Sequence, residues 1–97
     1  MLEVRYHRLV QRDLNAAMSY YGEASDSLAG DFYKEFLTGI NKVSANPKAF
    51  HFDLSGLRRC NLERFPYHFL YDLRVGHIRV WVLRYDRRKP SFGVSRF

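Results

Sequence analysis

The segment from Arg64 to Arg88 reads RFPYHFLYDLRVGHIRVWVLRYDRR, and it specifies much of the architecture. Two runs rich in aromatic and β-branched residues flank a short turn that contains Gly76, which is the pattern of an antiparallel β-hairpin. Alternating side chains of a strand point to opposite faces. In the first run one face carries Tyr67, Phe69, Tyr71 and Leu73, and in the second run one face carries Ile78, Val80 and Val82. Because both faces of the second run are apolar near its middle, we expect it to be a central strand.

The composition predicts a single globular domain over residues 1–97. Hydrophobic residues make up 46% of the chain and aromatic residues 16%, which is too apolar for a disordered segment. A chain of this length can close one core without metals or disulfides. The single cysteine, Cys60, excludes an intramolecular disulfide, and we expect a small buried residue of a strand rather than a catalytic thiol.

The N-terminal residues lack the apolar core of a signal peptide, and no long uncharged run is present that would span a membrane. A cytoplasmic location without membrane attachment is therefore expected. The four histidines and the single cysteine show no metal-ligand spacing, so no metal or other cofactor is implied.

The positive charge of the chain is concentrated in its C-terminal part. Residues 1–57 hold six Lys/Arg and seven Asp/Glu, whereas residues 58–97 hold ten Lys/Arg and three Asp/Glu, a net charge of +7. Most of these cations are arginines. This regional excess favours an anionic partner, either nucleic acid or an acidic protein.

The first half of the chain predicts a short strand followed by two helices. Alternating apolar and polar residues over positions 2–7 are typical of a half-buried strand. Two apolar stripes at helical spacing follow: Val10, Leu14, Ala17, Met18 and Tyr21, then Leu28, Phe32, Phe36, Ile40 and Val43. Ser25 or Asp26 is placed to cap the second helix, and Asn46-Pro47 ends it. The two helices are expected to form an antiparallel hairpin.

The remaining residues complete a two-layer domain. Residues 47–56 are expected to form a connecting loop, and residues 57–62 a strand that runs into the main hairpin. The order is then one strand, two helices and three antiparallel strands. Packing the helical hairpin on one face of the sheet gives an α+β fold.

The order of these elements, together with several short motifs, resembles the RelE/ParE superfamily of toxins from type II toxin–antitoxin systems. The motifs are Tyr20-Tyr21, Asn46-Pro47, Leu57-Arg58-Arg59, Arg64-Phe65-Pro66-Tyr67 and Arg87-Arg88-Lys89-Pro90. The resemblance covers the chain from about Val4 to Pro90. It implies a β-α-α-β-β-β fold, with the helical hairpin packed on an antiparallel sheet. It also implies a toxin that a cognate antitoxin, encoded beside it, holds inactive.

Two activities compete within this resemblance. RelE-like members cleave mRNA in the ribosomal A site, whereas ParE-like members poison DNA gyrase. The run Arg87-Arg88-Lys89-Pro90 is more similar to the ParE-like or plasmid-stabilisation branch, which implies growth arrest through gyrase. A third interpretation is a degenerate member that binds an antitoxin-like protein or RNA without toxicity.

The candidate contacts with a target are cationic and aromatic residues near the end of the hairpin: Arg58, Arg59, Arg84, Tyr85, Arg87, Arg88 and Lys89. Trp81 is expected to pack in the core, with stacking on a target as the alternative. A metal-free ribonuclease would need an acid, a base and cations, and the candidates for those roles are Arg84, Tyr85 and His68. RelE-like members commonly place a tyrosine or histidine in the tail, where this chain has Phe92 and Phe97.

The antitoxin is expected to bring an acidic, initially disordered segment, because a strongly cationic half-chain attracts such segments. The surface expected to receive it is the helical hairpin with one sheet edge, on the hypothesis that so small a sheet leaves the apolar stripes partly uncovered. The residues assigned to this surface are Val10, Leu14, Phe32 and Phe36.

Overall fold

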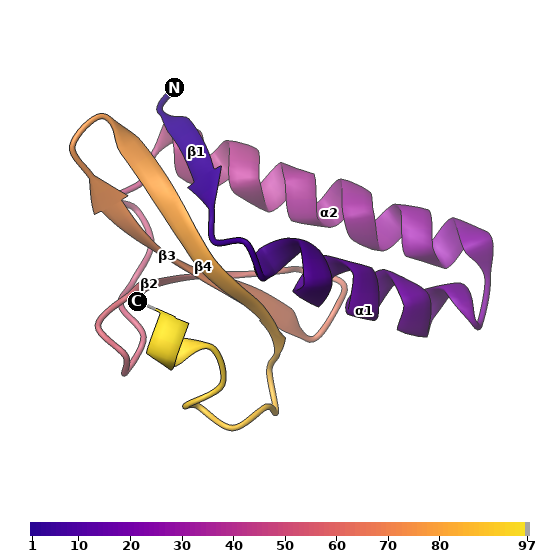
Figure 1. Cartoon of the computed structure of the whole chain (residues 1–97). Coiled ribbons are helices and arrows are strands. Elements are labelled where there is room, and N and C mark those ends of the chain that lie inside the picture. Colours follow the sequence, from indigo (N-terminus) through magenta and orange to yellow (C-terminus); the bar gives the residue numbers. More distant parts are fainter. Residues whose placement is uncertain (97) are drawn as a thin grey trace.

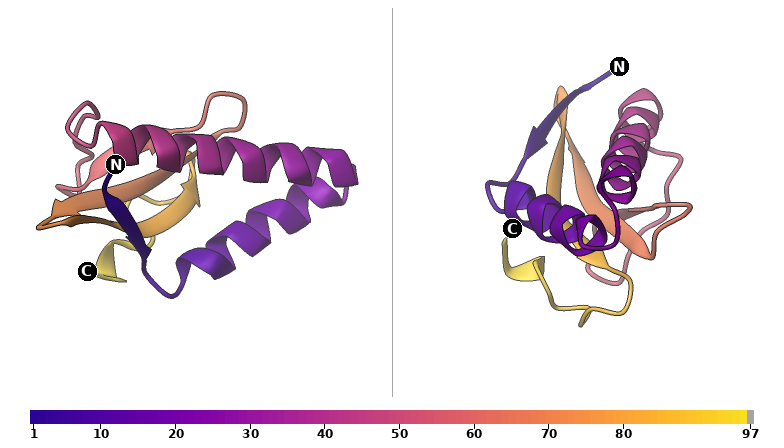
Figure 2. Two further views of the ribbon diagram at one scale, coloured as in Figure 1. Left: turned by 90° about the horizontal axis from the view of Figure 1, so that it is seen from above. Right: turned by 90° about the vertical axis from the view of Figure 1, so that its right-hand side faces the viewer.

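The computed structural model describes residues 1–96 as a four-stranded sheet with two helices on one face (Figures 1 and 2). The elements are, in order, β1 (Glu3–Tyr6), α1 (Val10–Gly22), α2 (Asp26–Ala45), β2 (Arg58–Asn61), β3 (Tyr67–Arg74), β4 (His77–Tyr85) and a short 3-10 helix, η1 (Val94–Arg96). The predicted α+β fold and its β-α-α-β-β-β order are therefore confirmed.

The helix boundaries lie where the local sequence places them. Ser25 is the N-cap of α2, and its hydroxyl accepts a hydrogen bond of 3.1 Å from the backbone N–H of Leu28. Asn46 is the C-cap, and Pro47 prevents continuation of the helix. The buried side chains of the two helices follow the predicted stripes: Val10, Leu14, Ala17, Phe32, Phe36, Ile40 and Val43. These stripes pack on the sheet and form the main core.

The sheet has the strand order β1-β4-β3-β2, so β4 is central, as predicted. β3 pairs antiparallel with both β2 and β4, and Gly76 adopts a φ of +79° in the turn of the hairpin. One pairing differs from the expected antiparallel sheet, because β1 runs parallel to β4 with Arg5 opposite Arg79. The helical hairpin and two strands between β1 and β4 supply the long connection that a parallel pair requires.

A β-bulge in β4 changes which side chains face the helices. Pairing with β3 is regular up to Val80 and resumes at Val82, so Trp81 is the extra residue. The simple alternation predicted for this strand is therefore wrong beyond Val80. Val82 lies on the face remote from the helices, here called the outer face, while Leu83 joins the core beneath the helices. Trp81 is buried on the outer side, which confirms its core position.

The C-terminal tail covers part of the outer face. Phe92 packs on a second, smaller apolar cluster that comprises Leu57, Leu70, Trp81 and Val82. Gly93 has a φ of +79°, and a Cβ at this position would lie 2.5 Å from a Val82 methyl carbon. Arg96 then donates to both carboxylate oxygens of Asp13, at 2.6 and 3.0 Å, and ties the tail to α1. The other aromatic residue assigned to the tail, Phe97, lies outside the described residues.

Substitution of Gly93 by alanine is expected to lower the free energy of unfolding by about 3 kcal/mol, because strained backbone and a clash with Val82 add together. Gly76 provides a matched control, since its φ is also +79° but, apart from its chain neighbours, no heavy atom of the described residues lies within 4 Å of the place that a methyl group would occupy. Gly76→Ala should therefore lower the free energy of unfolding only through backbone strain, by about 1 kcal/mol. Urea denaturation measures both values, and equal losses would contradict close docking of the tail on Val82.

Candidate functional site

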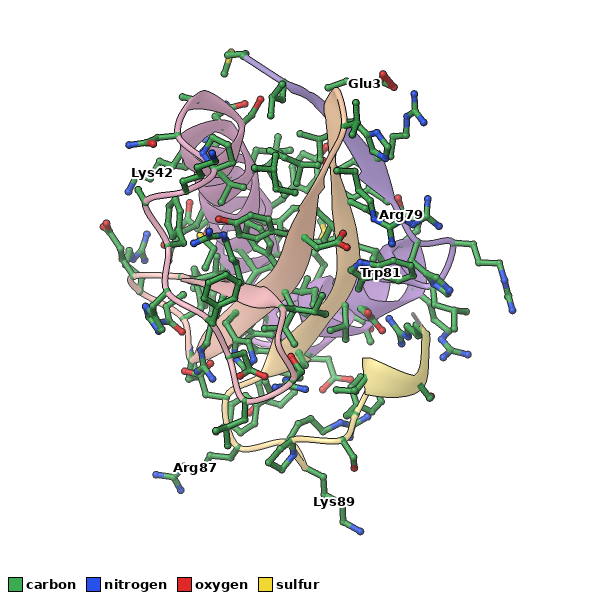
Figure 3. The ribbon with its side chains drawn as sticks, turned by 90° about the vertical axis from the view of Figure 1, so that its left-hand side faces the viewer. Glu3, Lys42, Arg79, Trp81, Arg87 and Lys89 are labelled. Atoms are coloured by element: carbon green, nitrogen blue, oxygen red, sulfur yellow. The ribbon has the colours of Figure 1, made fainter. Side chains whose placement is uncertain are left out.

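The loop after β4 presents three cations, Arg87, Arg88 and Lys89, here called the basic tip. The loop turns sharply because the backbone N–H of Arg88 donates to the carbonyl of Tyr85 at 2.9 Å. All three side chains are exposed, and Arg87 and Lys89 extend away from the body of the protein (Figure 3). Within residues 1–96 none of the three forms an ion pair. Their charge is thus available to an anionic partner.

An aromatic groove of about 590 Å³ adjoins the basic tip. Its lining includes Tyr20 and Tyr21 from α1, Tyr67 and Tyr85 from the hairpin, and Arg88 from the tip. The rings of Tyr67 and Tyr85 meet edge to face at 5.5 Å, and 39% of Tyr85 remains exposed. Cations beside exposed aromatic rings form a surface that suits the binding of a macromolecule.

Arg84 does not belong to this exposed surface, because only 4% of it is accessible. Its Nε donates to His68 at 2.8 Å, and its Nη1 donates to the carbonyls of Pro90 and Phe92 at 2.7 and 3.0 Å. Burial lowers the pKa of Arg84, and the nearby charge of Asp53 opposes that shift. This geometry corrects the expectation that Arg84 faces a target or a scissile phosphate: its guanidinium holds the tail against the sheet.

His68 is equally enclosed, with 1% of it exposed. Its Nδ1 lies 2.7 Å from a carboxylate oxygen of Asp86, while its Nε2 lies 2.8 Å from the donating Nε of Arg84. Nε2 must therefore be the unprotonated nitrogen, and Nδ1 donates to Asp86. Burial lowers the pKa of His68, although the hydrogen bond to Asp86 acts in the opposite direction. Since both nitrogens are engaged, this arrangement does not support the predicted role of His68 in proton transfer.

The lowered pKa of His68 predicts a stability that depends on pH. Above about pH 6.5, the ordinary histidine pKa, the imidazole is neutral in both folded and unfolded chains and its contribution is complete. Below that pH the unfolded chain takes up the proton first, so stability declines as pH falls toward the folded pKa. In His68→Gln this decline should be shallower. Denaturation at several pH values between about 7.5 and about 5 measures the slopes, and identical slopes would contradict the assignment.

The two arginines of β2 are half-buried and engaged within the protein. Arg58 donates from Nη1 to the carbonyl of Phe50 at 2.7 Å. Arg59 lies between two carboxylates, 3.7 Å from Asp53 and 3.6 Å from Asp86. Both therefore fix the loop before β2 to the sheet. Of the seven residues predicted to contact a target, the structure brings four together at an exposed surface: Tyr85, Arg87, Arg88 and Lys89.

The four residues assigned to antitoxin binding are buried in the main core: Val10, Leu14, Phe32 and Phe36. The assignment is corrected, because β3 and β4 cover both helical stripes completely enough to leave these side chains inaccessible. The exposed apolar residues of this region are instead Tyr6 in β1 and Tyr33 and Leu37 in α2. Burial raises the pKa of Tyr6, and Tyr33 raises it further.

Cys60 is buried in β2, as predicted. Burial raises the pKa of its thiol to about 11, which keeps it protonated at neutral pH and unsuited to nucleophilic attack. In the part of the chain that the structure describes, no cluster of His, Cys, Asp or Glu is suited to hold a metal ion. None of the helices described is both long and apolar enough to cross a membrane.

Comparison with known proteins places this geometry in context. No family model matches the chain, and no curated protein matches it. Among solved structures, a chain of the chromosomal ParDE TA (toxin–antitoxin) system from P. aeruginosa shares the architecture with a TM-score of 0.75. The match covers 88% of this chain and 96% of that chain at 19% sequence identity. The chain has a ParE-like fold. At this level of identity the likeness establishes the fold alone.

Proposed function

We propose that this ParE-like chain is the toxin of a type II toxin–antitoxin system and that it arrests growth by poisoning DNA gyrase. The observation that carries the proposal is the contrast between the buried and the exposed candidates. Arg84 and His68 are enclosed and hydrogen-bonded within the protein, whereas the basic tip is exposed and without ion pairs. A poison that traps another enzyme on DNA needs a contact surface of this kind and no catalytic group of its own.

The ribonuclease alternative is less well supported by the same geometry. Cleavage without a metal needs both a base and an acid within hydrogen-bond reach of the reacting oxygens. Of the three nuclease candidates only Tyr85 is exposed, and a single phenol supplies one of these roles. Arg84 and His68 would have to leave their network before they could act on RNA.

Induced expression of the chain in bacteria tests this choice. The proposal expects growth arrest with accumulating double-strand breaks and intact mRNA, relieved by co-expression of the acidic product of the neighbouring gene. Cleavage of mRNA inside codons on ribosomes would instead support the nuclease. Normal growth despite a folded and abundant protein would support a degenerate member without toxicity.

We further propose that the antitoxin binds the edge of β1 and the adjacent surface of α2. β1 is the end strand of the sheet, so its outer edge can accept an added strand. Tyr6, Tyr33 and Leu37 line this region with exposed apolar surface. An acidic segment would also be attracted by the net positive charge of the chain, +6.

Replacement of both Tyr33 and Leu37 by glutamate is expected to weaken antitoxin binding by about 3 kcal/mol, or about 100-fold, because two apolar contacts are lost and like charges are introduced. Tyr20→Glu, an exposed substitution on α1, serves as the control and should leave affinity within about threefold. Isothermal titration with the antitoxin measures the difference. Hydrogen exchange in the complex provides a second readout, and an absence of protection in β1 and α2 would refute this surface.

A further inference from the structure

Arg5, Arg74 and Arg79 lie on three neighbouring strands and share the outer face of the sheet, away from the basic tip, and Arg8 follows directly after β1. Arg5 belongs to β1, Arg74 to β3 and Arg79 to β4, while Arg8 lies in the turn between β1 and α1. We refer to them as the outer-face arginines. In Figure 3, Arg79 lies beside Trp81 on the side of β4 away from α2, and Arg87 and Lys89 of the basic tip lie apart from them at the bottom of the view.

The arrangement brings like charges together. Arg5 and Arg79 are direct neighbours across the β1–β4 pair, a placement that disfavours folding unless a counter-charge intervenes. The carboxylate of Glu3 lies 2.8 Å from Arg5, and Arg5 is its one ion-pair partner among residues 1–96. Among the described residues neither Arg8 nor Arg79 forms an ion pair. The cluster therefore keeps positive charge that the fold itself does not neutralise.

The guanidinium groups are nevertheless held in place. The Arg79 guanidinium lies 4.8 Å from the centre of the Trp81 ring, and that of Arg74 lies 5.7 Å from it. Asp72 fixes this arrangement, since one carboxylate oxygen accepts from Trp81 Nε1 at 3.0 Å and the other accepts from Arg74 Nε at 2.9 Å. A bound anion would thus meet cations that have already lost part of their side-chain freedom.

The environment of His7 indicates that Arg8 adds to the positive electrostatic potential near Trp81. The ring of His7 lies 5.8 Å from that of Trp81. Burial lowers the pKa of His7, and the charges of Arg96, Arg8 and Arg79 lower it further, whereas Asp13 opposes them. The imidazole is therefore disposed to stay neutral, and the field at this point comes from arginine.

We propose that the outer-face arginines bind the phosphate backbone of double-stranded DNA. The planar guanidinium matches the geometry of a phosphate and can bind it through two parallel hydrogen bonds, and contacts to phosphates position a protein on a duplex. Arg5 and Arg74 belong to strands separated by β4, so these two strands lie about 10 Å apart. That spacing is close to the width of about 12 Å of the major groove, so long side chains can reach phosphates on both of its borders.

A single strand fits this surface less well. Proteins that bind single strands provide aromatic rings on which unpaired bases stack. On the outer face the ring of Trp81 is buried and lies beneath Arg74 and Arg79, so it offers no open stacking surface. The proposal goes beyond the function proposed above, because it concerns a different surface and does not require an effect on gyrase.

Fluorescence anisotropy with the full chain and a labelled DNA duplex of about 20 base pairs tests the proposal over about 50 to 200 mM salt. Arg8→Gln with Arg79→Gln is expected to weaken binding by at least about tenfold and to reduce the salt slope by about 1.8, the value for two lost phosphate contacts. A matched control, Lys34→Gln with Lys42→Gln, removes two exposed cations on α2 and should change affinity by less than about threefold.

The proposal would be overturned by equal weakening in the α2 control, by equal affinity for a single strand or for phosphatidylglycerol vesicles, or by no duplex binding at the lowest salt. The tip variant Arg87→Gln with Arg88→Gln separates the two surfaces, and it should retain duplex binding. Loss in that variant alone would place the DNA contact at the tip instead. Arg5→Gln with Arg8→Gln leaves the contacts of Arg74 and Arg79 with the Trp81 ring in place. This variant must also lose duplex binding, so that a folding defect caused by Arg79→Gln cannot account for the loss in the first variant.

Discussion

Replacement of Arg87 and Arg88 together by alanine is expected to abolish growth arrest and to leave the protein folded. Each exposed guanidinium that meets a carboxylate or phosphate contributes about 1.5 kcal/mol or more to binding, so the pair contributes about 3 kcal/mol, or about 100-fold in affinity. The fold should tolerate the change, because neither side chain forms an ion pair within residues 1–96. Arg88 does stack 4.1 Å above Phe92, a contact that contributes about 1 kcal/mol at most when exposed.

Growth curves after induction measure the functional effect, and thermal unfolding of the purified variant confirms the fold. The double substitution of Lys34 and Lys42 by alanine removes the same charge from α2 and should leave toxicity intact. Arg87→Ala with Lys89→Ala avoids the Phe92 contact and should also lose toxicity. Undiminished toxicity in the Arg87 and Arg88 double variant would exclude the basic tip as the contact surface.

The largest effect on stability is expected from Arg96→Ala, which should lower the free energy of unfolding by about 3 to 5 kcal/mol. The side chains of Arg96 and Asp13 are only 7% and 5% exposed, and they share two hydrogen bonds. Removal of the arginine leaves a buried carboxylate whose remaining donor among the described residues is the backbone N–H of Leu83, 3.2 Å away. An uncompensated charge in that position is costly, whereas the pair itself contributes much less than this loss.

An exposed pair provides the comparison. Arg64 lies 3.7 Å from Asp31 at the surface, and Arg64→Ala should cost between about 0 and 1 kcal/mol. Asp13→Asn combined with Arg96→Ala should recover part of the loss, because the buried charge is then absent. Urea denaturation of the three variants measures these differences. A loss below about 1 kcal/mol in Arg96→Ala would show that the tail does not depend on this pair.

Much of the fold could be predicted because its signals are local. The helical stripes, the Ser25 cap and the Asn46-Pro47 stop each depend on residues a few positions apart. Gly76 marked the hairpin turn for the same reason. The central position of β4 followed from apolar residues on both of its faces. Periodicity over a short segment reports burial directly, and burial determines the layer in which a segment lies.

The features that escaped prediction depend on distant contacts. The parallel pairing of β1 with β4 joins opposite ends of the chain, and the bulge at Trp81 carries no glycine to mark it. Arg96 meets Asp13 across 83 positions, a pairing that no local pattern encodes.

The candidate site was predicted only in part, for the same physical reason. A polar residue on a strand is exposed unless another segment of the chain covers it. Local sequence does not reveal which strand residues are covered in this way. The C-terminal tail covers Arg84, which donates hydrogen bonds to the carbonyls of Pro90 and Phe92. Arg84 and its partner His68 therefore stabilise the fold instead of contacting a target. The basic tip lies in an exposed loop, and there the pattern of charge was a sufficient guide.

Purified chain, free of antitoxin, added to DNA gyrase in a supercoiling and cleavage assay tests the proposed function most directly. We expect loss of supercoiling and accumulation of linear DNA. The Arg87→Ala and Arg88→Ala double variant should remain inactive even at about 100 times the concentration at which the unmodified chain acts. Gyrase that supercoils normally in the presence of a chain shown to arrest growth would contradict the proposal. That result would direct attention to the ribosome and to Tyr85.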